Sequence, residues 1–600
     1  MRFTQTPCIL LLYCWILNIC SVTAVSQTDG GMLYPRESET REVKDLSGIW
    51  NFRPDTSQNR QQSFTERWYS ASLSDTGPVI PMPVPSSYND ITQDKSLRDF
   101  IGWVWYDREF YVPSSWLGQR VILRLESVRY YSIVWVNGVQ VAEHEMGHLP
   151  FEGNIGPVAQ FGGHNRVTVA VNNTLTPYTL PPGKIQHKSG PGYPKDYFVQ
   201  ILQFGFFNYA GIDRPVKLYT TPSTYIDDIT IHTDISGNNG ILSWSIVPGG
   251  LCNPNVKLCK VAVEILSKKG MTVALSADLQ GQVKVENVQA WWPFSMNESS
   301  PAYLYTMQVT LKSENTTDVY RLPFGFRTVS LSNNGILINK RSFYCHGVGK
   351  HEDYDVRGKG VDNAMVVRDF SLLRWLGVNC FRTSHYPYAD EIMDQADQLG
   401  IVVIDECPAI GLTEPVNYNN QTLYLHKKSM MELVRRDKNR PSVILWSIGN
   451  EPLSSYAGAG PHFGEVIKVT KQLDPYRPLT FASNNVNPHT DHVMSQVDVV
   501  CVNIYFGWYS ENGHTEVIEY GVEDVIGALH TYYNKPVMVS EYGAESLPGL
   551  HVSPSFSYSE EYQNDLLAAH HKAFDKIKGK TLAGEMIWNF ADFLIDQEVR

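Results

Sequence analysis

Hydrophobic and polar residues follow two different patterns in the two halves of the chain. Between about residues 45 and 220, short runs such as VWYDREFYV, RVILRLESV and NRVTVAVNN are separated by Gly, Pro and Asn. Runs at this spacing without long helical periods predict an all-β sandwich. WVNGVQV predicts a hairpin, because Asn137 and Gly138 can form its tight turn. A second series of strand patterns, from about residue 224 to 328, suits an immunoglobulin-like sandwich.

The pattern changes near Arg327. Continuous apolar segments such as IVVIDE, VILWSIGNE and PVMVSEYGAE now alternate with helical patterns such as VVRDFSLLRWLG and DEIMDQADQLG. Strands of this kind are buried on both faces, and their alternation with helices predicts parallel βαβ units. The strand patterns number eight, as in a TIM barrel.

Polar side chains gather where the predicted strands end. In strand order they are His346 and Lys350, Arg382 and His385, Asp405 and Glu406, Asn450 and Glu451, Asn484, Asn503 and Tyr505, Glu541 and Tyr542, and Trp588. TIM barrels build their active sites at this end of the strands, so we expect a functional site here. We interpret Asp405 and Glu406 as structural partners of Arg382 rather than as catalysts.

Glu451 and Glu541 carry the chemical prediction. Taken alone, Asn450, Glu451 and Pro452 also match the start of a helix, with Asn as the cap and Glu facing the helix dipole. Two glutamates at the ends of the fourth and seventh strands, however, suit glycoside hydrolysis, in which one carboxyl is protonated and the other ionised. The sequence has no Asp-rich metal cluster, Gly-rich phosphate loop, repeated CxxC or HExxH, so we predict neither a metal nor a cofactor.

Length, composition and charge narrow the class of protein. A chain of 600 residues suggests about three or four domains. The 12% of aromatic residues includes many side chains of the kind that stack on sugar rings. A formal net charge of −12 argues against nucleic acid as a partner, although it leaves room for an anionic substrate in a locally basic pocket.

Residues 1–24 have the features of a secretory signal peptide, with one Arg, an apolar run and small residues before a cleavage site near Ala24. The stretch is too short for a membrane anchor, and no later apolar run is long enough to span a membrane. The glycosylation sequons agree with the secretory route. They begin at Asn172, Asn297, Asn315 and Asn420.

Cysteine spacing gives one disulfide prediction. Cys252 and Cys259 flank a turn in LCNPNVKLC, and we expect them to pair. The remaining cysteines beyond the signal peptide lie within apolar strand patterns, where a free buried thiol is expected. They are Cys345, Cys380, Cys407 and Cys501.

A family resemblance rests on motifs that occur in order between about Gly48 and Phe593. WSIGNEP, VSEYGAE, FRTSHYPYADE, GIVVIDECP, KHEDYDVRGKG and WNFADF resemble motifs of the family 2 glycoside hydrolases, in particular the vertebrate lysosomal β-glucuronidases. The resemblance implies a jelly-roll sugar-binding-like domain at 25–222, an immunoglobulin-like domain at 223–328 and a (β/α)8 barrel at 329–600. It also implies a retaining exo-hydrolase that removes terminal β-D-glucuronic acid from glycosaminoglycan fragments and glucuronide conjugates. Such enzymes are homotetramers of the lysosome, and we expect this chain to reach it through the secretory pathway or to be secreted.

The resemblance also assigns roles to residues. Glu451 corresponds to the acid/base, Glu541 to the nucleophile, and Tyr505 to the tyrosine that supports the nucleophile. Asn450 corresponds to the residue that binds the sugar 2-hydroxyl, and the remaining pocket residues are His385, Tyr509 and Trp588. A tyrosine hydroxyl stabilises the ionised form of Glu541, whereas partial burial raises the pKa of Glu451. Taken alone, Trp588 also suits a plug of the barrel interior, and His385 suits a core histidine.

Two departures from the family pattern lead to further expectations. Gly205 stands where the family has an Asp that reaches the substrate, so one sugar contact is expected to be lost. The sequence stops at Arg600, before the Asn-x-Lys motif with which the family grips the glucuronate carboxylate and before the family's last barrel helix. We therefore expect a weaker preference for uronic acid. We also expect this sequence to be either a fragment or short form of an active enzyme, or a variant with impaired activity.

Alternative functions stay open at this point. One is a catalytically silent glycan-binding or assembly-modulating protein that joins complete subunits, and another is a related β-galactosidase or β-mannosidase. Lys184, Lys188 and Lys195 form either a basic loop for an anionic chain or an ordinary solvated surface.

Overall fold

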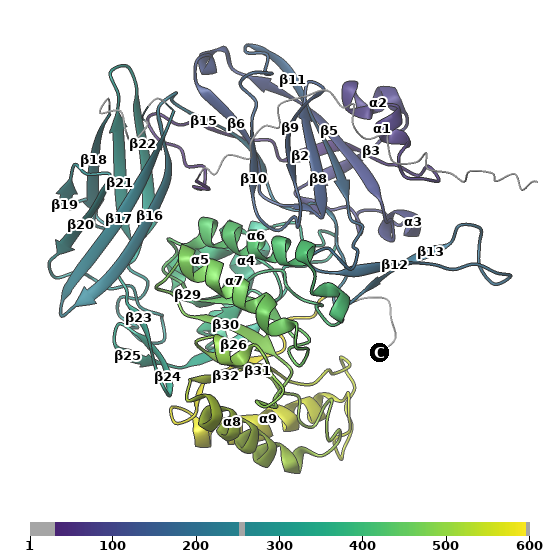
Figure 1. Ribbon diagram of the computed structural model, residues 1–600, viewed down its shortest axis with the longest axis vertical. Coiled ribbons are helices and arrows are strands. Elements are labelled where there is room, and N and C mark those ends of the chain that lie inside the picture. Colours follow the sequence, from purple (N-terminus) through teal and green to yellow (C-terminus); the bar gives the residue numbers. More distant parts are fainter. Residues whose placement is uncertain (1–30, 251, 253–258, 596–600) are drawn as a thin grey trace, which may run out of the picture. The chain divides into compact units, whose positions relative to one another are not determined.

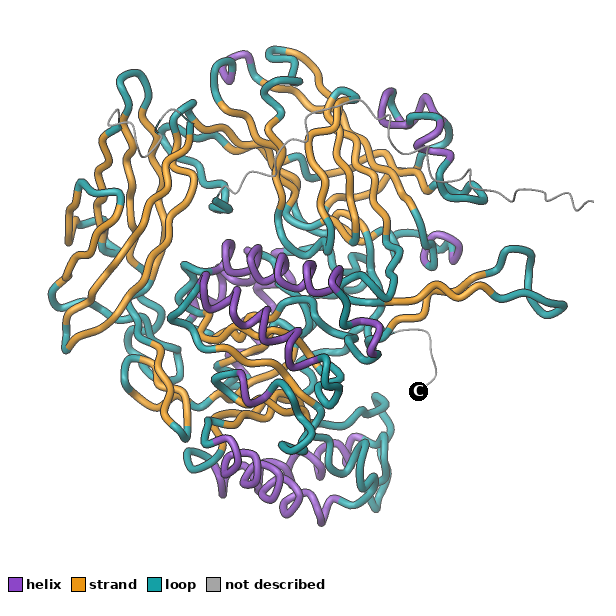
Figure 2. The backbone as a smooth tube through the Cα atoms, in the orientation of Figure 1, coloured by secondary structure: helices purple, strands orange, loops and turns teal. Residues whose placement is uncertain are grey.

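The computed structural model describes residues 31–250, 252 and 259–595. The predicted signal peptide, at residues 1–24, lies outside the described residues. Strand-rich segments come first along the chain, and a barrel covered by helices follows them (Figure 1; Figure 2). None of the helices in the described ranges is long and apolar enough to cross a membrane.

The first sandwich contains two main sheets. Its strands are β1 (Val43–Asp45), β2 (Gly48–Pro54), β3 (Ile80–Val84), β4 (Ser86–Ser87), β5 (Trp103–Val112), β6 (Arg120–Leu125), β7 (Val128–Arg129), β8 (Tyr131–Val136), β9 (Val139–His144), β10 (Phe151–Asn154), β11 (Gly163–Asn172), β12 (Gly183–His187), β13 (Phe198–Leu202), β14 (Gly211–Ile212) and β15 (Val216–Thr221), with short helices α1 (Gln62–Thr65), α2 (Leu73–Thr76) and α3 (Lys95–Arg98). The sheet β1-β15-β6-β10 packs on the sheet β3-β2-β5-β11-β8-β9 through buried residues such as Trp50, Leu123 and Val169. The predicted hairpin is present, because Asn137 and Gly138 join β8 to β9 with φ of 51° and 81°.

The hairpin of β12 and β13 carries the basic loop of the first sandwich. Lys184 and Lys195 are exposed there, and the ammonium of Lys188 lies 5.7 Å from the ring of Tyr193. This arrangement suits both interpretations of the loop, so the choice between them stays open.

The second sandwich is immunoglobulin-like. It consists of β16 (Tyr225–Ser236), β17 (Asn239–Gly249), β18 (Lys260–Leu266), β19 (Thr272–Ser276), β20 (Gln280–Val285), β21 (Tyr305–Lys312) and β22 (Thr317–Phe324). The sheets β16-β17-β20 and β19-β18-β21-β22 enclose one apolar core. Alternate residues of β17 and β21 are buried, which is why the sequence of each strand alternates between apolar and polar positions.

The remaining strands and helices form a closed barrel and a small three-stranded sheet that packs against it. The small sheet contains β23 (Val329–Ser332), β24 (Gly335–Ile338) and β25 (Arg341–Phe343), and the barrel contains β26 (Cys345–Gly349), β27 (Cys380–Arg382), β28 (Val402–Glu406), β29 (Val443–Asn450), β30 (Leu479–Ser483), β31 (Val500–Asn503), β32 (Val537–Tyr542) and β33 (Leu582–Ile587). All eight strands are parallel and neighbour one another in chain order, so the predicted TIM barrel is confirmed. Ile336 and Phe343 share a buried cluster with Leu445 and Met538 of the barrel interior, so apolar packing fills the N-terminal end and leaves the C-terminal end for polar groups.

Six long helices cover the barrel. They are α4 (Asn363–Trp375), α5 (Asp390–Leu399), α6 (Asn420–Asp437), α7 (Ala459–Leu473), α8 (Ile518–Tyr533) and α9 (Glu560–Ile577). Side chains cap several of them, as when Asn419 accepts from the amide of Thr422 at 3.0 Å at the start of α6. In the described part of the chain, no α-helix lies between β30 and β31, and none follows β33 up to residue 595.

The cysteine predictions have mixed outcomes. The structure joins Cys252 to Cys259, and it also joins Cys345 to Cys380. The expectation of free thiols is therefore wrong for Cys345 and Cys380, because β26 and β27 are neighbours in the barrel and the sequence pattern of each strand does not show its neighbour. Cys407 and Cys501 are free and buried, as expected.

Candidate active site

The end of β29 places Asn450 and Glu451 at the barrel mouth. All eight residues of β29 are buried, which explains the apolar run with which it begins. Beyond it the backbone turns, since Glu451 has a φ of 45° and its amide donates to the carbonyl of Ala482 on β30 at 2.8 Å. Helix α7 begins only at Ala459, so the interpretation of Asn450 to Pro452 as a helix start is wrong.

Glu451 accepts hydrogen bonds from two asparagine amides. Nδ2 of Asn503, at the end of β31, lies 2.7 Å from Oε1, and Nδ2 of Asn484, which follows β30, lies 3.4 Å from Oε2. Burial raises the pKa of Glu451, and the two amide donors offset only part of that increase. The protonated form of Glu451 is therefore favoured relative to an exposed glutamate.

Glu541, near the end of β32, has stronger donors. The hydroxyl of Tyr505 lies 2.6 Å from Oε2, and Nη2 of Arg382 contacts Oε1. Burial and the neighbouring Glu451 raise the pKa of Glu541 to about 7, against the decrease caused by Arg382 and Tyr505. The sequence reasoning included the effect of Tyr505 but not the larger effect of burial.

The donors around the two carboxyls decide which one holds a shared proton. The carboxyl of Glu541 faces the guanidinium of Arg382 and the hydroxyl of Tyr505. Because burial holds the pKa of Tyr505 well above its usual value, this hydroxyl keeps its proton, so both groups donate to Glu541. A proton on Glu541 would displace one of these donors. Within the described part of the chain, Oε2 of Glu451 has only the long contact to Asn484, so that oxygen can take the proton without losing a short hydrogen bond. The geometry therefore favours ionised Glu541 beside protonated Glu451.

Arg382 connects Glu541 to the barrel interior. Its side chain is 1% exposed, and Nη1 lies 2.8 and 2.9 Å from the two carboxyl oxygens of Glu406. Burial alone would raise the pKa of Glu406, but Arg382 and the hydrogen bonds from His385 and Ser447 lower it to about 2. Glu406 is therefore an ionised anchor for Arg382, in agreement with its structural interpretation.

Asp405 does not contact Arg382, contrary to our expectation. It accepts from the hydroxyl of Thr383 at 3.3 Å, and burial together with nearby Asp437 raises its pKa well above the usual range. Its side chain leaves β28 on the opposite side from Glu406, since consecutive residues of a strand face opposite ways.

Asn450 lies between Arg382, which contacts Glu541, and Asn503, which contacts Glu451. Its Oδ1 is 3.3 Å from Nη1 of Arg382 and 3.3 Å from Nδ2 of Asn503. With the oxygen held in this way, the amide nitrogen makes no hydrogen bond to the described residues and is available to a ligand hydroxyl.

Aromatic rings form one side of the mouth. The ring of His385 lies 5.0 Å from that of Trp588 and 6.1 Å from that of Phe206, which belongs to the first sandwich. Burial lowers the pKa of His385 to about 4, so its ring is neutral above that pH. Trp588 is half-buried at the end of β33, so it is not a plug of the barrel interior. Tyr509 is 72% exposed, with its ring 4.9 Å from that of Tyr505.

Sequence reasoning missed three aromatic residues here. Phe206 packs against His385 and His351, and the ring of His351 lies 4.1 Å from that of Phe593. Phe206 follows Gly205 directly, so the segment that differs from the family pattern does reach the mouth. The only available signal was the position of these residues inside or beside the quoted motifs.

Some predicted strand-end residues lie away from the carboxyl pair. His346 is half-exposed and bonds Glu585 and Lys578, and the hydroxyl of Tyr542 lies 2.9 Å from His571 of α9. Lys350 pairs with Asp369 of α4 at 2.8 Å. The described residues contain no cluster of three or more His, Cys, Asp or Glu side chains that could hold a metal ion.

Three family models match the chain over nearly all of its described length. They are the sugar binding domain of glycosyl hydrolases family 2 at residues 43–222, a second family 2 domain at 224–327 and the family 2 TIM barrel domain at 329–599.

The chain belongs to family 2 of the glycosyl hydrolases. Within this family it is 50% identical to the β-glucuronidases of Felis catus and of Homo sapiens over 579 residues, which are 95% of this chain and 88% of each relative. The solved β-D-glucuronidase of Dictyoglomus thermophilum is 40% identical, with a TM-score of 0.87 over 95% of this chain and 94% of that one. The β-glucuronidase of Ruminococcus gnavus in complex with D-glucaro 1,5-lactone is 32% identical, with a TM-score of 0.88 over 95% of both chains.

Proposed function

We propose that this glycoside hydrolase is an exo-β-D-glucuronidase that acts with retention of configuration. The observation that carries the proposal is the unequal environment of two carboxyls at one barrel mouth, with a guanidinium and a hydroxyl on Glu541 and only amides on Glu451. Paired carboxyls with opposite protonation are what a retaining glycosidase requires. The similarity to β-glucuronidases supports the choice of sugar.

In the first step of the proposed mechanism, ionised Glu541 attacks the anomeric carbon. Glu451 gives its proton to the glycosidic oxygen, the bond from that oxygen to the anomeric carbon breaks, and the aglycone leaves as an alcohol. A glucuronosyl ester on Glu541 and an ionised Glu451 remain.

In the second step Glu451 acts as a base. It takes a proton from a water molecule, and the water oxygen attacks the anomeric carbon from the side that the aglycone left. The ester bond to Glu541 breaks, β-glucuronic acid is released, and both carboxyls return to their starting states.

The neighbouring residues position these groups. Arg382 and Tyr505 hold Glu541 in its ionised form and in one orientation, and the amide of Asn450 donates to the sugar 2-hydroxyl, a contact that strengthens in the transition state. His385, Trp588 and Tyr509 contact the sugar around the mouth.

The natural substrates in this proposal are glucuronide ends of glycosaminoglycan fragments and glucuronide conjugates. Disulfides are typical of the secretory pathway, and we assign the chain to the lysosome or to secretion, as a homotetramer with N-glycans. None of the four sequon asparagines, Asn172, Asn297, Asn315 and Asn420, is buried.

Hydrolysis of three aryl glycosides tests the sugar preference. We expect the β-glucuronide to be cleaved faster than the β-galactoside or the β-mannoside, because the relatives with half of their residues identical to this chain are β-glucuronidases. Glu451→Gln should lower kcat about 10²- to 10⁴-fold, and Glu541→Gln should lower it at least as much. Equal rates on all three glycosides, or an active Glu541→Gln variant, would overturn the proposal.

Product stereochemistry tests the mechanism separately. Proton NMR of a running reaction should show the β-anomer of glucuronic acid first, followed by mutarotation. If the α-anomer appears first, the enzyme inverts, and Glu541 is then a base rather than a nucleophile.

A further inference from the structure

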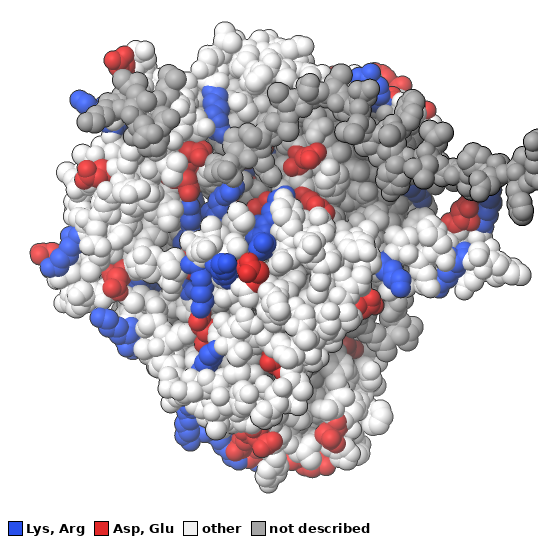
Figure 3. Space-filling model, viewed as in Figure 1, with Lys and Arg blue, Asp and Glu red and all other residues white. Residues whose placement is uncertain are grey.

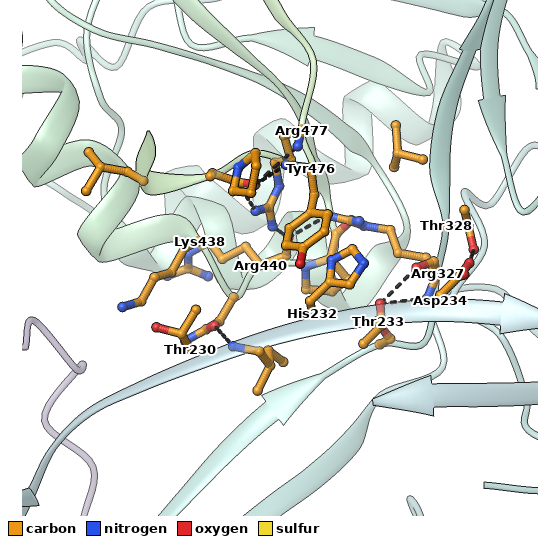
Figure 4. Close-up of a pocket in the computed structure, with 18 residues that line it drawn as sticks. Thr230, His232, Thr233, Asp234, Arg327, Thr328, Lys438, Arg440, Tyr476 and Arg477 are labelled. Atoms are coloured by element: carbon orange, nitrogen blue, oxygen red, sulfur yellow. Dashed lines mark hydrogen bonds and ion pairs between the residues drawn. The ribbon is translucent and has the colours of Figure 1, made fainter. Parts of the chain in front are cut away.

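A pocket lies at the end of the barrel opposite to Glu451 and Glu541 (Figure 4). Its volume is about 240 Å³, and its walls come from β16 of the second sandwich, from the segment around Arg327 that follows β22, and from the segments that precede β29 and β30. Because those segments lead into the N-terminal ends of the strands, a molecule bound here does not reach the catalytic carboxyls. The pocket is therefore a separate candidate site.

Arg327 is a buried cation in the wall of this pocket. Its side chain is 8% exposed, and it donates to backbone carbonyls, with Nε 2.5 Å from that of Pro441 and Nη2 2.8 Å from that of Val443. Carbonyls accept hydrogen bonds without supplying a full negative charge. Arg327 has no ion pair with a described carboxylate, and its Nη1 makes no hydrogen bond to the described residues.

Arg477 lies beside Arg327 and uses the same carbonyls. Its Nε is 2.8 Å from the carbonyl of Val443, and its Nη2 is 3.0 Å from that of Arg440, which also lies 3.3 Å from Nη2 of Arg327. Among the described carboxylates, only Asp474, 2.5 Å from Nη1 of Arg477, is in direct contact with either guanidinium group. Burial, together with the nearby charge of Arg477, lowers the pKa of Arg327 to about 9.

The other cations of the pocket already have carboxylate partners, whereas Asp234 forms no ion pair within the described residues. Lys438 contacts Asp228, and Asp234 accepts from the hydroxyl of Thr328 at 2.5 Å. Arg440 pairs with Asp390, Asp394, Asp397 and Asp437. Figure 3 shows Lys and Arg side chains gathered near the junction of the second sandwich and the barrel, with Asp and Glu among them. Arg327 is thus the cation of this pocket that lacks a carboxylate in direct contact among the described residues.

A pair of stacked rings lies next to these guanidinium groups. The centroids of His232 and Tyr476 are 3.6 Å apart at an interplanar angle of 19°, and Figure 4 shows the two rings face to face in the middle of the pocket. Tyr476 is 59% exposed. Flat aromatic surfaces of this kind pack well against the apolar face of a sugar ring.

We propose that this pocket binds a sugar unit that carries an oxyanion, with the sulfate or phosphate group at Arg327 and Arg477 and the sugar ring against Tyr476. An oxyanion accepts the hydrogen bonds that Nη1 of Arg327 does not make to the described residues, and it supplies a negative charge in direct contact with this guanidinium. The volume of about 240 Å³ is several times the roughly 30 Å³ that one water occupies in the liquid, so there is room for more than a free ion. The proposal does not depend on the proposed glucuronidase activity.

Calorimetric titration of the whole chain tests the ligand class with four probes. They are galactose 6-sulfate, galactose 6-phosphate, galactose and inorganic sulfate, none of which is a glucuronide. We expect one or both esters to bind at least tenfold more tightly than galactose and to weaken as NaCl is added. The comparison of the two esters shows which source of oxyanion the pocket prefers.

Three outcomes would overturn the proposal. The first is that neither ester gives saturable heat, and the second is that galactose binds as tightly as its esters. The third is that inorganic sulfate binds as tightly as both esters, which would indicate an adventitious ion only.

Substitutions locate the binding. Tyr476→Ala should weaken binding of the better ester about tenfold, which corresponds to the loss of a stacking contact. Arg327→Gln should weaken it about a hundredfold, but the change also removes carbonyl contacts and can disturb folding, so Tyr476→Ala is the decisive variant. Tyr520→Ala is the matched control, because Tyr520 is a 76% exposed tyrosine on α8. Unchanged binding in Tyr476→Ala, or an equal loss in Tyr520→Ala, would contradict the assignment.

Discussion

Replacing Tyr505 with Phe removes one hydroxyl from beside Glu541 and leaves the aromatic ring in place. The hydroxyl oxygen lies 2.6 Å from Oε2 of Glu541 and, because the pKa of Tyr505 is held well above its usual value, it remains a donor. A hydrogen bond to a charged group contributes about 1.5–3 kcal/mol. At about 1.36 kcal/mol per pKa unit, its loss raises the pKa of Glu541 by roughly 1–2 units above the value near 7.

The pH dependence of kcat/KM with an aryl β-glucuronide measures this shift. In the proposed mechanism attack requires ionised Glu541, so its pKa sets the acid limb of the profile in the free enzyme. We expect the acid limb of Tyr505→Phe to move to higher pH by roughly 1–2 units, so that the rate falls about 10- to 100-fold at acid pH and recovers as the pH rises. Tyr520→Phe, on the exposed face of α8, should keep the parent profile. A deficit of the same size at every pH would refute the reasoning, because it would show that the hydroxyl acts on something other than the ionisation of Glu541.

Three further predictions follow from the same network. Arg382→Gln leaves Glu406 and Glu541 without their shared cation, so the free energy of unfolding measured in urea should fall by about 3–5 kcal/mol. A loss under about 1 kcal/mol would contradict the role of Arg382 as a buried ion-pair partner. Glu541→Gln removes a carboxyl whose pKa is raised from 4.5 to about 7. A raised carboxyl pKa contributes stability that is fully present below about pH 4 and is lost as the pH rises through 7, so the stability of the variant relative to the parent should increase by about 3 kcal/mol between pH 4 and pH 8 in thermal unfolding, and a difference that stays the same across this range would contradict the raised pKa. Asn503→Ala removes a donor that lowers the pKa of Glu451, so the basic limb of the kcat/KM profile should move to higher pH, and an unchanged limb would show that Asn503 does not tune Glu451.

The barrel was predictable because its strands are buried on both faces. The sequence of β29 begins with four apolar residues in a row and all of its residues are buried, whereas β17 alternates and has one face on a core. Neighbour relations were not predictable in the same way. The pairing of Cys345 with Cys380 depends on the contact of β26 with β27, which is a property of the closed barrel rather than of either strand alone.

The sequence predicted which residues lie at the ends of the barrel strands, but it did not predict the direction in which each side chain points. Glu451, Asn503 and Glu541 converge because their strands end at the same edge of the barrel. His346 occupies a similar position in the sequence, yet it lies on the outside beside Glu585 and Lys578, since a shift of one residue along a strand reverses the side that a side chain faces. Phe206 comes from the first sandwich, and only the packing of that domain on the barrel brings it to His385.

In the proposed mechanism, the electrostatic coupling of Glu451 to Glu541 accounts for how Glu451 acts first as an acid and then as a base. Glu451 raises the pKa of Glu541, and since the interaction of two charges acts on both, ionised Glu541 also raises the pKa of Glu451. In the proposed first step Glu541 becomes a neutral ester, so that repulsion disappears. Arg382, which lowers the pKa of Glu451, then has only Glu406 as an ionised partner. Both changes lower the pKa of Glu451 after it has given up its proton, and the ionised form needed to activate water is favoured until the ester is cleaved.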